Sequence, residues 1–221
     1  MKRSSPHWQR WVRLGSSVAL ILFFSVAAAA QQIQVTLDPA QTKIDWTLGD
    51  VLHTVHGSFK LKSGSILIDT RTGDASGQIV VDAKSGESGN RSRDGKMHKE
   101  VLQSARFPEI IFFPKHASGN MPAQGSATLQ VTGVFRIHGS DHDLTLSLPV
   151  QVEGSRATAA TKFDVPYEAW GMKNPSTLFL KVDSKVAIEV SAVATVVTGA
   201  AGAAGSNRQQ YRALRRSLRQ R

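Results

Sequence analysis

The sequence predicts an all-β fold, an antiparallel β-barrel of about eight strands with one short helix. Apolar and polar residues alternate along successive short runs between Gln32 and about Thr198, which is the pattern of strands that bury one face. Clusters of Gly, Ser, Asn and Asp, which favour tight turns, separate the runs. The runs reach about ten residues, longer than the strands of typical small sandwiches, so we favour a closed barrel over a sandwich.

Each predicted strand is identified by its alternating apolar positions. In the first run, Ile44, Trp46 and Leu48 share one face. Further predicted strands span residues 55–61, 128–137, 143–152, 157–165, 177–182 and 185–197. Residues 65–69 and 77–83 are short β-branched runs, and 109–113 is a short apolar run that Pro114 is expected to end.

The predicted helix lies within residues 92–103, where Met97, Val101 and Leu102 recur at helical spacing. A barrel of about eight strands leaves an interior just wide enough for side chains or for one slender ligand. The sequence alone does not decide whether side chains or a ligand fill the interior.

The charge of the chain is concentrated at its two ends. The chain has 27 Lys and Arg against 17 Asp and Glu, a formal net charge of +10. Four of these basic residues precede residue 16 and six arginines follow residue 205, with no acidic residue among either group. The remainder is therefore balanced, and nucleic acid is not an expected partner. The absence of Cys excludes disulfides, thiolate metal sites and a Cys nucleophile.

Residues 1–30 have the organisation of a signal peptide. A basic segment precedes the apolar stretch 18–30, which ends in Ala28-Ala29-Ala30 before Gln31. This small-x-small ending suits cleavage by signal peptidase. An uncleaved anchor is the alternative, but thirteen residues are fewer than the roughly 20 that a membrane span needs. We therefore expect a bacterial Sec-type signal peptide and a periplasmic or secreted protein.

The C-terminal segment 199–221 differs in composition from the predicted barrel, residues 31–198. A Gly/Ala-rich stretch, expected to be a linker, leads into an Arg-rich tail. The tail is either a solvated disordered end or a short basic helix in which Tyr211, Leu214 and Leu218 share a face. In the second case it would make weak, reversible contact with an anionic membrane surface.

Several short motifs follow one another in a particular order along the chain: residues 37–46, 53–59, Arg93-Asp94 with the following short helix, 106–112, 129–139, 163–171 and 182–186. In this order, over residues 37–193, they resemble the YceI-like family of exported, lipocalin-like lipid-binding proteins. The shared order, rather than any single motif, carries the resemblance.

The resemblance implies a lipocalin-like barrel around a hydrophobic pocket for a polyisoprenoid, quinone-like or fatty-acyl chain. It implies a binding protein rather than an enzyme, with no cofactor and no catalytic residue. The candidate ligand contacts are the aromatic residues predicted to face inward: Trp46, Phe59, Phe107, Phe112, Phe135, Phe163 and Trp170. These residues either line a channel or simply fill the barrel.

Arg93 has two interpretations. It pairs with Asp94 to fix the helix, which is the reading we favour, or it contacts an anionic head group as a candidate ligand residue. The rival function for the chain is a structural or interaction barrel of the cell envelope, a stress or adhesion factor, which would have a filled interior and no bound lipid.

The histidines are not expected to form a metal site. His53 and His56 are three residues apart on a predicted strand and so face opposite sides. His138, Asp141 and His142 would suit a metal, but the same segment has the Gly and Asp chemistry of a hairpin turn. The chain also lacks the Gly-x-Ser-x-Gly motif of a nucleophile elbow and a glycine-rich phosphate loop.

Overall fold

A computed structural model describes residues 31–49, 54–176 and 181–200. Within these ranges the chain forms nine strands and one short helical segment. The helical segment comprises α1 (Arg91–Lys96) and a π-helical turn, η1 (Met97–Val101). The strands are β1 (Gln31–Leu37), β2 (Lys43–Gly49), β3 (Thr54–Asp69), β4 (Ala75–Glu87), β5 (Glu109–Ser118), β6 (Gly125–Ile137), β7 (Ser140–Glu153), β8 (Arg156–Val165) and β9 (Val186–Ala200).

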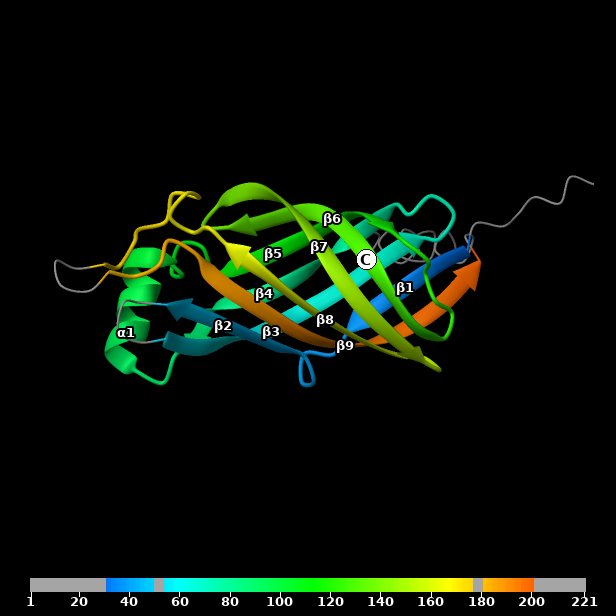
Figure 1. The fold of residues 1–221 in the computed structure, drawn as a ribbon, viewed down its shortest axis with the longest axis horizontal. Coiled ribbons are helices and arrows are strands. Elements are labelled where there is room, and N and C mark those ends of the chain that lie inside the picture. The colour runs from blue at the N-terminus through cyan, green and yellow to red at the C-terminus, as the bar shows by residue number, and fades with distance from the viewer. Residues whose placement is uncertain (1–30, 50–53, 177–180, 201–221) are drawn as a thin grey trace, which may run out of the picture.

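The nine strands close into a barrel with eight strand positions (Figure 1). β1 and β2 share one position because both lie between β3 and β9. β1 pairs with the second half of β3, for example Val35 with Ile66, and β2 pairs with the first half, for example Ile44 with Phe59. β9 is divided between them in the same way. All pairings are antiparallel, and the β3–β4 pairing closes the ring. The predicted fold class is thus confirmed.

The strand boundaries differ from the predicted ones in several places. β5 continues through Pro114 to Ser118, although the predicted run ended at residue 113. Residues 181 and 182 of the predicted run 177–182 belong to none of the nine strands. The predicted strands at 55–61 and 65–69 are one strand, β3, whose pairing with β4 is interrupted by bulges between Ser58 and Ser63. The pattern does not single out β1 as a strand. Gly199 and Ala200 belong to β9 rather than to the expected linker, because their backbones pair with Gln32 and Gln31.

Several sequence predictions fall outside the described residues. These are the signal peptide at 1–30, the Arg-rich tail at 201–221, His53, and residues 177–180 of the run 177–182.

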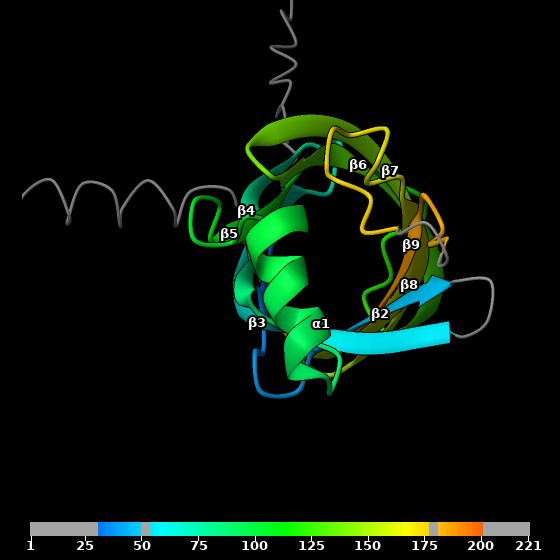
Figure 2. The same ribbon diagram turned by 90° about the vertical axis from the view of Figure 1, so that its left-hand side faces the viewer.

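The helical segment lies across one end of the barrel (Figure 2), and it confirms the predicted helix. Asn90 caps α1, since its side-chain oxygen accepts hydrogen bonds from the backbone N–H groups of Ser92 and Arg93, each at 3.1 Å. Below the helix, Leu102 and the partly buried Met97 pack on a core cluster that includes Ile110 and Val165. No helix in the described part of the chain is long and apolar enough to span a membrane.

Candidate ligand-binding site

The inward faces of the strands surround a cavity of about 700 Å³. Its lining alternates along each strand, as with Ile44, Trp46 and Leu48 on β2. The volume lies within the range of small-molecule pockets, about 300–1,000 Å³. The interior of the barrel is therefore hollow. The sequence alone did not decide between a filled and a hollow interior.

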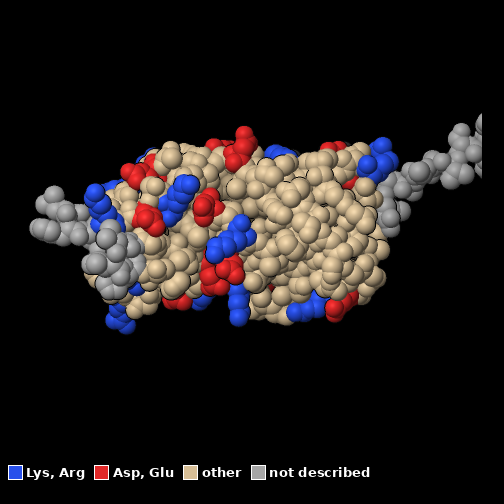
Figure 3. Space-filling model, viewed as in Figure 1, with Lys and Arg blue, Asp and Glu red and all other residues tan. Residues whose placement is uncertain are grey.

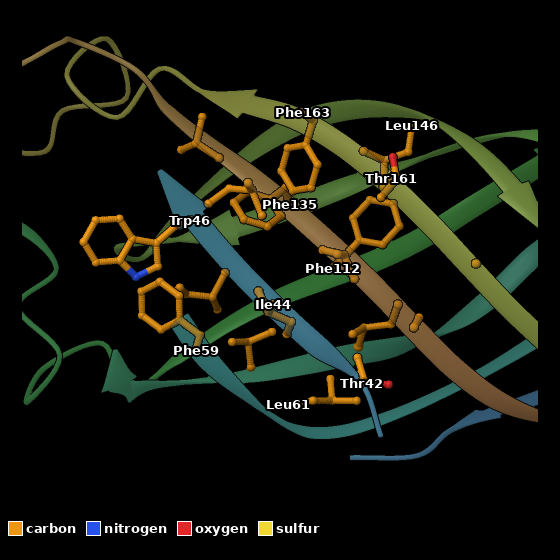
Figure 4. Close-up of a pocket in the computed structure, with 18 of the residues that line it drawn as sticks. Thr42, Ile44, Trp46, Phe59, Leu61, Phe112, Phe135, Leu146, Thr161 and Phe163 are labelled. Carbon is orange, nitrogen blue, oxygen red and sulfur yellow. The ribbon is translucent and has the colours of Figure 1, made fainter. Parts of the chain in front are cut away.

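Five of the seven aromatic residues proposed as ligand contacts line this cavity (Figure 4). They come from β2, β3, β5, β6 and β8, so the aromatic rings are contributed from around the barrel wall. Phe135 and Phe163 are in edge-to-face contact, with ring centroids 6.0 Å apart. The five residues are Trp46, Phe59, Phe112, Phe135 and Phe163.

Phe107 and Trp170 do not line the cavity, in contrast to the sequence expectation. The Phe107 ring packs against His138, with ring centroids 4.7 Å apart, in the β6–β7 turn. Trp170 stacks on His142 with centroids 4.0 Å apart. Both residues lie in connections rather than in strands, where no alternation fixes the side of the barrel to which a side chain points.

The polar residues of the lining are few, and all of its charged residues lie on α1. Arg93 and Lys96 are the charged side chains among the described residues that line the cavity, accompanied by the neighbouring Asn90 and Ser92. The rest of the lining is overwhelmingly apolar. The cavity therefore has one polar, cationic end, beneath the helix.

The ion pairs of the described residues do not include the expected pair between Arg93 and Asp94. Its Nε donates to Ser88 Oγ at 2.7 Å and its terminal nitrogen donates to the Ser88 carbonyl oxygen at 2.9 Å. Asp94 accepts hydrogen bonds from the N–H and the hydroxyl of the same serine. Ser88 thus links the two side chains, and Arg93 has a structural role while it also borders the cavity.

Tyr167 is a lining residue that sequence analysis missed. It follows β8 in a connection without alternation, is 5% exposed, and donates a hydrogen bond from its hydroxyl to the Asp183 carbonyl oxygen at 2.6 Å. Burial, followed by the charges of Glu168 and Asp183, raises the pKa of Tyr167 to about 12. The tyrosine therefore ties the segment after β8 to the residues that precede β9.

The Tyr167→Phe variant should be less stable than the wild type by about 1 kcal/mol near neutral pH, because it loses one hydrogen bond. The difference should shrink between pH 10 and 12, since the phenol ionises near its ordinary pKa of 10.0 in the unfolded chain but only near 12 in the folded protein. Urea unfolding of both proteins at pH 8 and pH 11 measures this difference in the free energy of unfolding. An equal difference at both pH values would contradict this assignment.

The histidine segment forms a hairpin turn rather than a metal cluster. His138 and Gly139 both have positive φ angles, 53° and 78°, as a two-residue type I′ turn requires. Asp141 is paired with Arg136 at 2.5 Å. Burial and the charge of Arg106 lower the pKa of His138. In the described ranges no three His, Asp or Glu side chains are placed to hold a metal ion.

Comparison with known proteins defines the class of this barrel. The model of the YceI-like domain matches residues 35–194, and the chain belongs to this family. Among solved structures, Burkholderia cenocepacia BcnA superposes with a TM-score of 0.60 at 20% identity, covering 72% of this chain and 99% of that one.

A polyisoprenoid-binding domain from Saccharophagus degradans, implicated in plant cell wall breakdown, has a similar fold. It superposes with a TM-score of 0.58 at 14% identity, covering 74% of this chain and 98% of that one. At these identities the two likenesses establish the shared fold. No curated protein matches the sequence significantly.

Proposed function

We propose that the protein is a non-enzymatic carrier that holds an isoprenoid or another long-chain amphiphile inside the barrel. The observation that carries the proposal is the apolar cavity of about 700 Å³, which is lined from β1 to β9. Membership of the YceI-like family supports the same conclusion. A structural barrel without a ligand is the weaker candidate, because such a barrel would be expected to fill its interior with side chains.

The cavity volume limits the length of chain that fits inside. A water molecule occupies about 30 Å³ in the liquid, and a methylene group is of similar size. A volume of about 700 Å³ therefore holds a chain of about 20–25 carbon atoms. Each buried methylene contributes about 0.8 kcal/mol before ordering costs, so chain length and shape dominate the affinity.

Mass spectrometry of an organic extract of the natively purified protein tests the proposal. We expect an amphiphile whose apolar part has about 20–25 carbon atoms, in near-stoichiometric amount. A protein that releases no lipid, and that takes up none from added alcohols of C10 to C25 chain length, would contradict the proposed function.

We also propose that the protein is exported and acts in the periplasm or outside the cell. The basic N-terminal segment, the apolar stretch 18–30 and the Ala28-Ala29-Ala30 ending support this. N-terminal sequencing of the protein from its native cell should find Gln31 first. The double variant Ala28→Lys/Ala30→Lys, which removes the small residues, should retain the leader. A native protein that starts at Met1 or Lys2 would contradict the proposal.

A further inference from the structure

The strands β7 and β8 are joined along only part of their length. From their hairpin turn they pair over four positions, of which the last is Val150 with Ala159. Beyond it, in the described part of the chain, no backbone pairing joins residues 140–149 of β7 to residues 160–165 of β8. Both segments remain paired on their other sides, with β6 and β9. The two strands diverge toward the α1 end (Figure 1), and we call this unpaired stretch the β7–β8 seam.

Pro149 explains why the pairing stops. In an antiparallel pair the N–H and C=O groups of every second residue point to the same neighbouring strand. The Ser147 carbonyl oxygen faces β8, because it accepts a hydrogen bond from Thr161 Oγ1 at 2.9 Å. The backbone nitrogen of Pro149, two residues further on, therefore faces β8 as well. Since proline has no N–H to donate, it ends the ladder next to Val150.

A hydrogen bond and an aromatic stack take the place of the ladder along the seam. The hydrogen bond is the one from Thr161 to Ser147. The stack lies closer to the α1 end, where Trp170, in the connection after β8, lies on His142 of β7 with ring centroids 4.0 Å apart. Separating the two strands therefore breaks side-chain contacts rather than a row of backbone hydrogen bonds.

A comparison with β4 and β5 shows what is special about the seam. These two strands also pair over only four positions. They are joined again further along, by the bridge between Asp74 and His116 and by the hydrogen bond from the Ala117 N–H to the Gly73 carbonyl oxygen at 2.8 Å. Within the described ranges, β7 and β8 have no second backbone tie of this kind. Opening the barrel wall at the seam thus breaks fewer backbone hydrogen bonds than opening it between β4 and β5.

The two strands that border the seam form the wall of the cavity directly. Leu146 of β7 and Thr161 and Phe163 of β8 line the cavity on the inner side (Figure 4). Ser147 and Lys162, the next residues of β7 and β8 after Leu146 and Thr161, are exposed on the outer side. Separation of the strands would therefore connect the cavity sideways with the outside.

The outer side of the seam is unsuited to a strand from another protein. Asp143, Lys162 and Asp164 are exposed along its two edges. Figure 3 shows charged side chains of both signs gathered on the half of this face toward α1. Charged side chains on an edge strand oppose pairing with another chain. The unpaired edges therefore favour a role within the barrel over the docking of a partner strand.

We propose, building on the proposed function, that the ligand enters and leaves the cavity sideways through the β7–β8 seam. The strands separate between Pro149 and the α1 end, the hydrogen bond from Thr161 to Ser147 breaks, and Trp170 moves off His142. The chain of the amphiphile then passes between the two strands into the cavity. Because the opening is transient, the seam sets the rates of uptake and release and leaves the equilibrium affinity unchanged.

A covalent cross-link across the seam tests this inference. The chain has no Cys, so a short bis-maleimide joins only the introduced thiols in the full-length double variant Ser147→Cys/Lys162→Cys. Uptake and release of the neutral probe Nile red are followed by stopped-flow fluorescence. We expect both rates to fall at least about tenfold in the cross-linked protein, with an unchanged Kd. Wild-type rates in the cross-linked protein would overturn the inference.

The matched control is Gln130→Cys/Ser147→Cys, which shares one substitution with the test variant. Gln130 of β6 and Ser147 are cross-strand partners in a continuous ladder, so a cross-link between them restrains strands that do not separate in the proposed motion. Its uptake and release rates should equal those of the wild type. If this cross-link slows exchange as much as the one across the seam, the route is not the β7–β8 seam.

The variant Thr161→Val tests the seam without a cross-link. It keeps the shape of the side chain and removes the hydroxyl that bonds to Ser147, so uptake and release should both be about fivefold faster. Thr132→Val is the control, because the Thr132 hydroxyl donates to the His116 carbonyl oxygen at 3.5 Å across the paired strands β5 and β6. Its rates should be those of the wild type. Wild-type rates in Thr161→Val would contradict the proposed opening.

The same measurements separate this inference from the proposed function. If the wild-type protein takes up neither Nile red nor the C20 alcohol geranylgeraniol, the proposed function fails and the inference fails with it. If it binds both, and neither the seam cross-link nor Thr161→Val changes the exchange rates, only the sideways route fails.

Discussion

The Ala159→Trp variant should lose at least about tenfold in affinity for a C20 lipid while it stays folded. Ala159 lines the cavity from β8, beside Val150 of β7 and Ala192 of β9. An indole at this position enters the empty interior rather than a packed core, so it displaces ligand with little steric strain on the wall. Its effect on the free energy of unfolding should remain within about 1 kcal/mol.

Ala160→Trp is the matched control, because Ala160 is the next residue of β8 and is exposed on the outer surface. The same substitution on that side should leave lipid affinity unchanged. Affinity is measured by displacement of Nile red by geranylgeraniol, and folding by circular dichroism. If a folded Ala159→Trp protein binds the lipid as the wild type does, the ligand lies outside the barrel.

The alternation of apolar and polar residues predicted which side chains form the cavity wall, because in a strand with one buried face the apolar side chains point inward. Ile44, Trp46 and Phe135 face inward as the period-two pattern requires. The same pattern indicated about eight strands. It did not show that β1 and β2 occupy one position in series, because that arrangement depends on long β3 and β9 pairing with both.

The ends of the cavity were not predictable in the same way. Phe107, Trp170 and Tyr167 lie in connections, where the side of a residue is set by tertiary packing rather than by a local period. Lys96 borders the cavity only because the helical segment crosses the end of the barrel. The link between Arg93 and Asp94 through Ser88 likewise depends on how the chain enters the helix.

Gly57 is a position where a single added methyl group should cost considerable stability. A Cβ atom there would lie 2.3 Å from the Trp46 indole and 2.2 Å from the Glu87 carbonyl oxygen. Gly57 is the cross-strand partner of Trp46, so the absence of a side chain lets the indole pack flat on the β3 backbone. The φ angle of Gly57 is not among the positive ones, so the cost of an alanine is steric rather than conformational.

The Gly57→Ala variant should be destabilised by about 3 kcal/mol, at the upper end of ordinary overpacking. For a domain of this size the melting temperature should fall by about 6–12 °C. Gly95→Ala is the control, because Gly95 lies within α1 with no atom close to its would-be Cβ. That variant should be neutral or stabilised by up to about 1 kcal/mol.

Thermal and urea unfolding followed by circular dichroism measures both variants, and a double-mutant cycle identifies the clash. In Gly57→Ala/Trp46→Leu the two destabilisations should not add, because the smaller leucine leaves room for the new methyl group. Part of the loss should persist, since the Glu87 carbonyl remains in place. If Gly57→Ala is as stable as the wild type, the indole of Trp46 does not pack on β3, and the α1 end of the cavity has a different shape from the one described above.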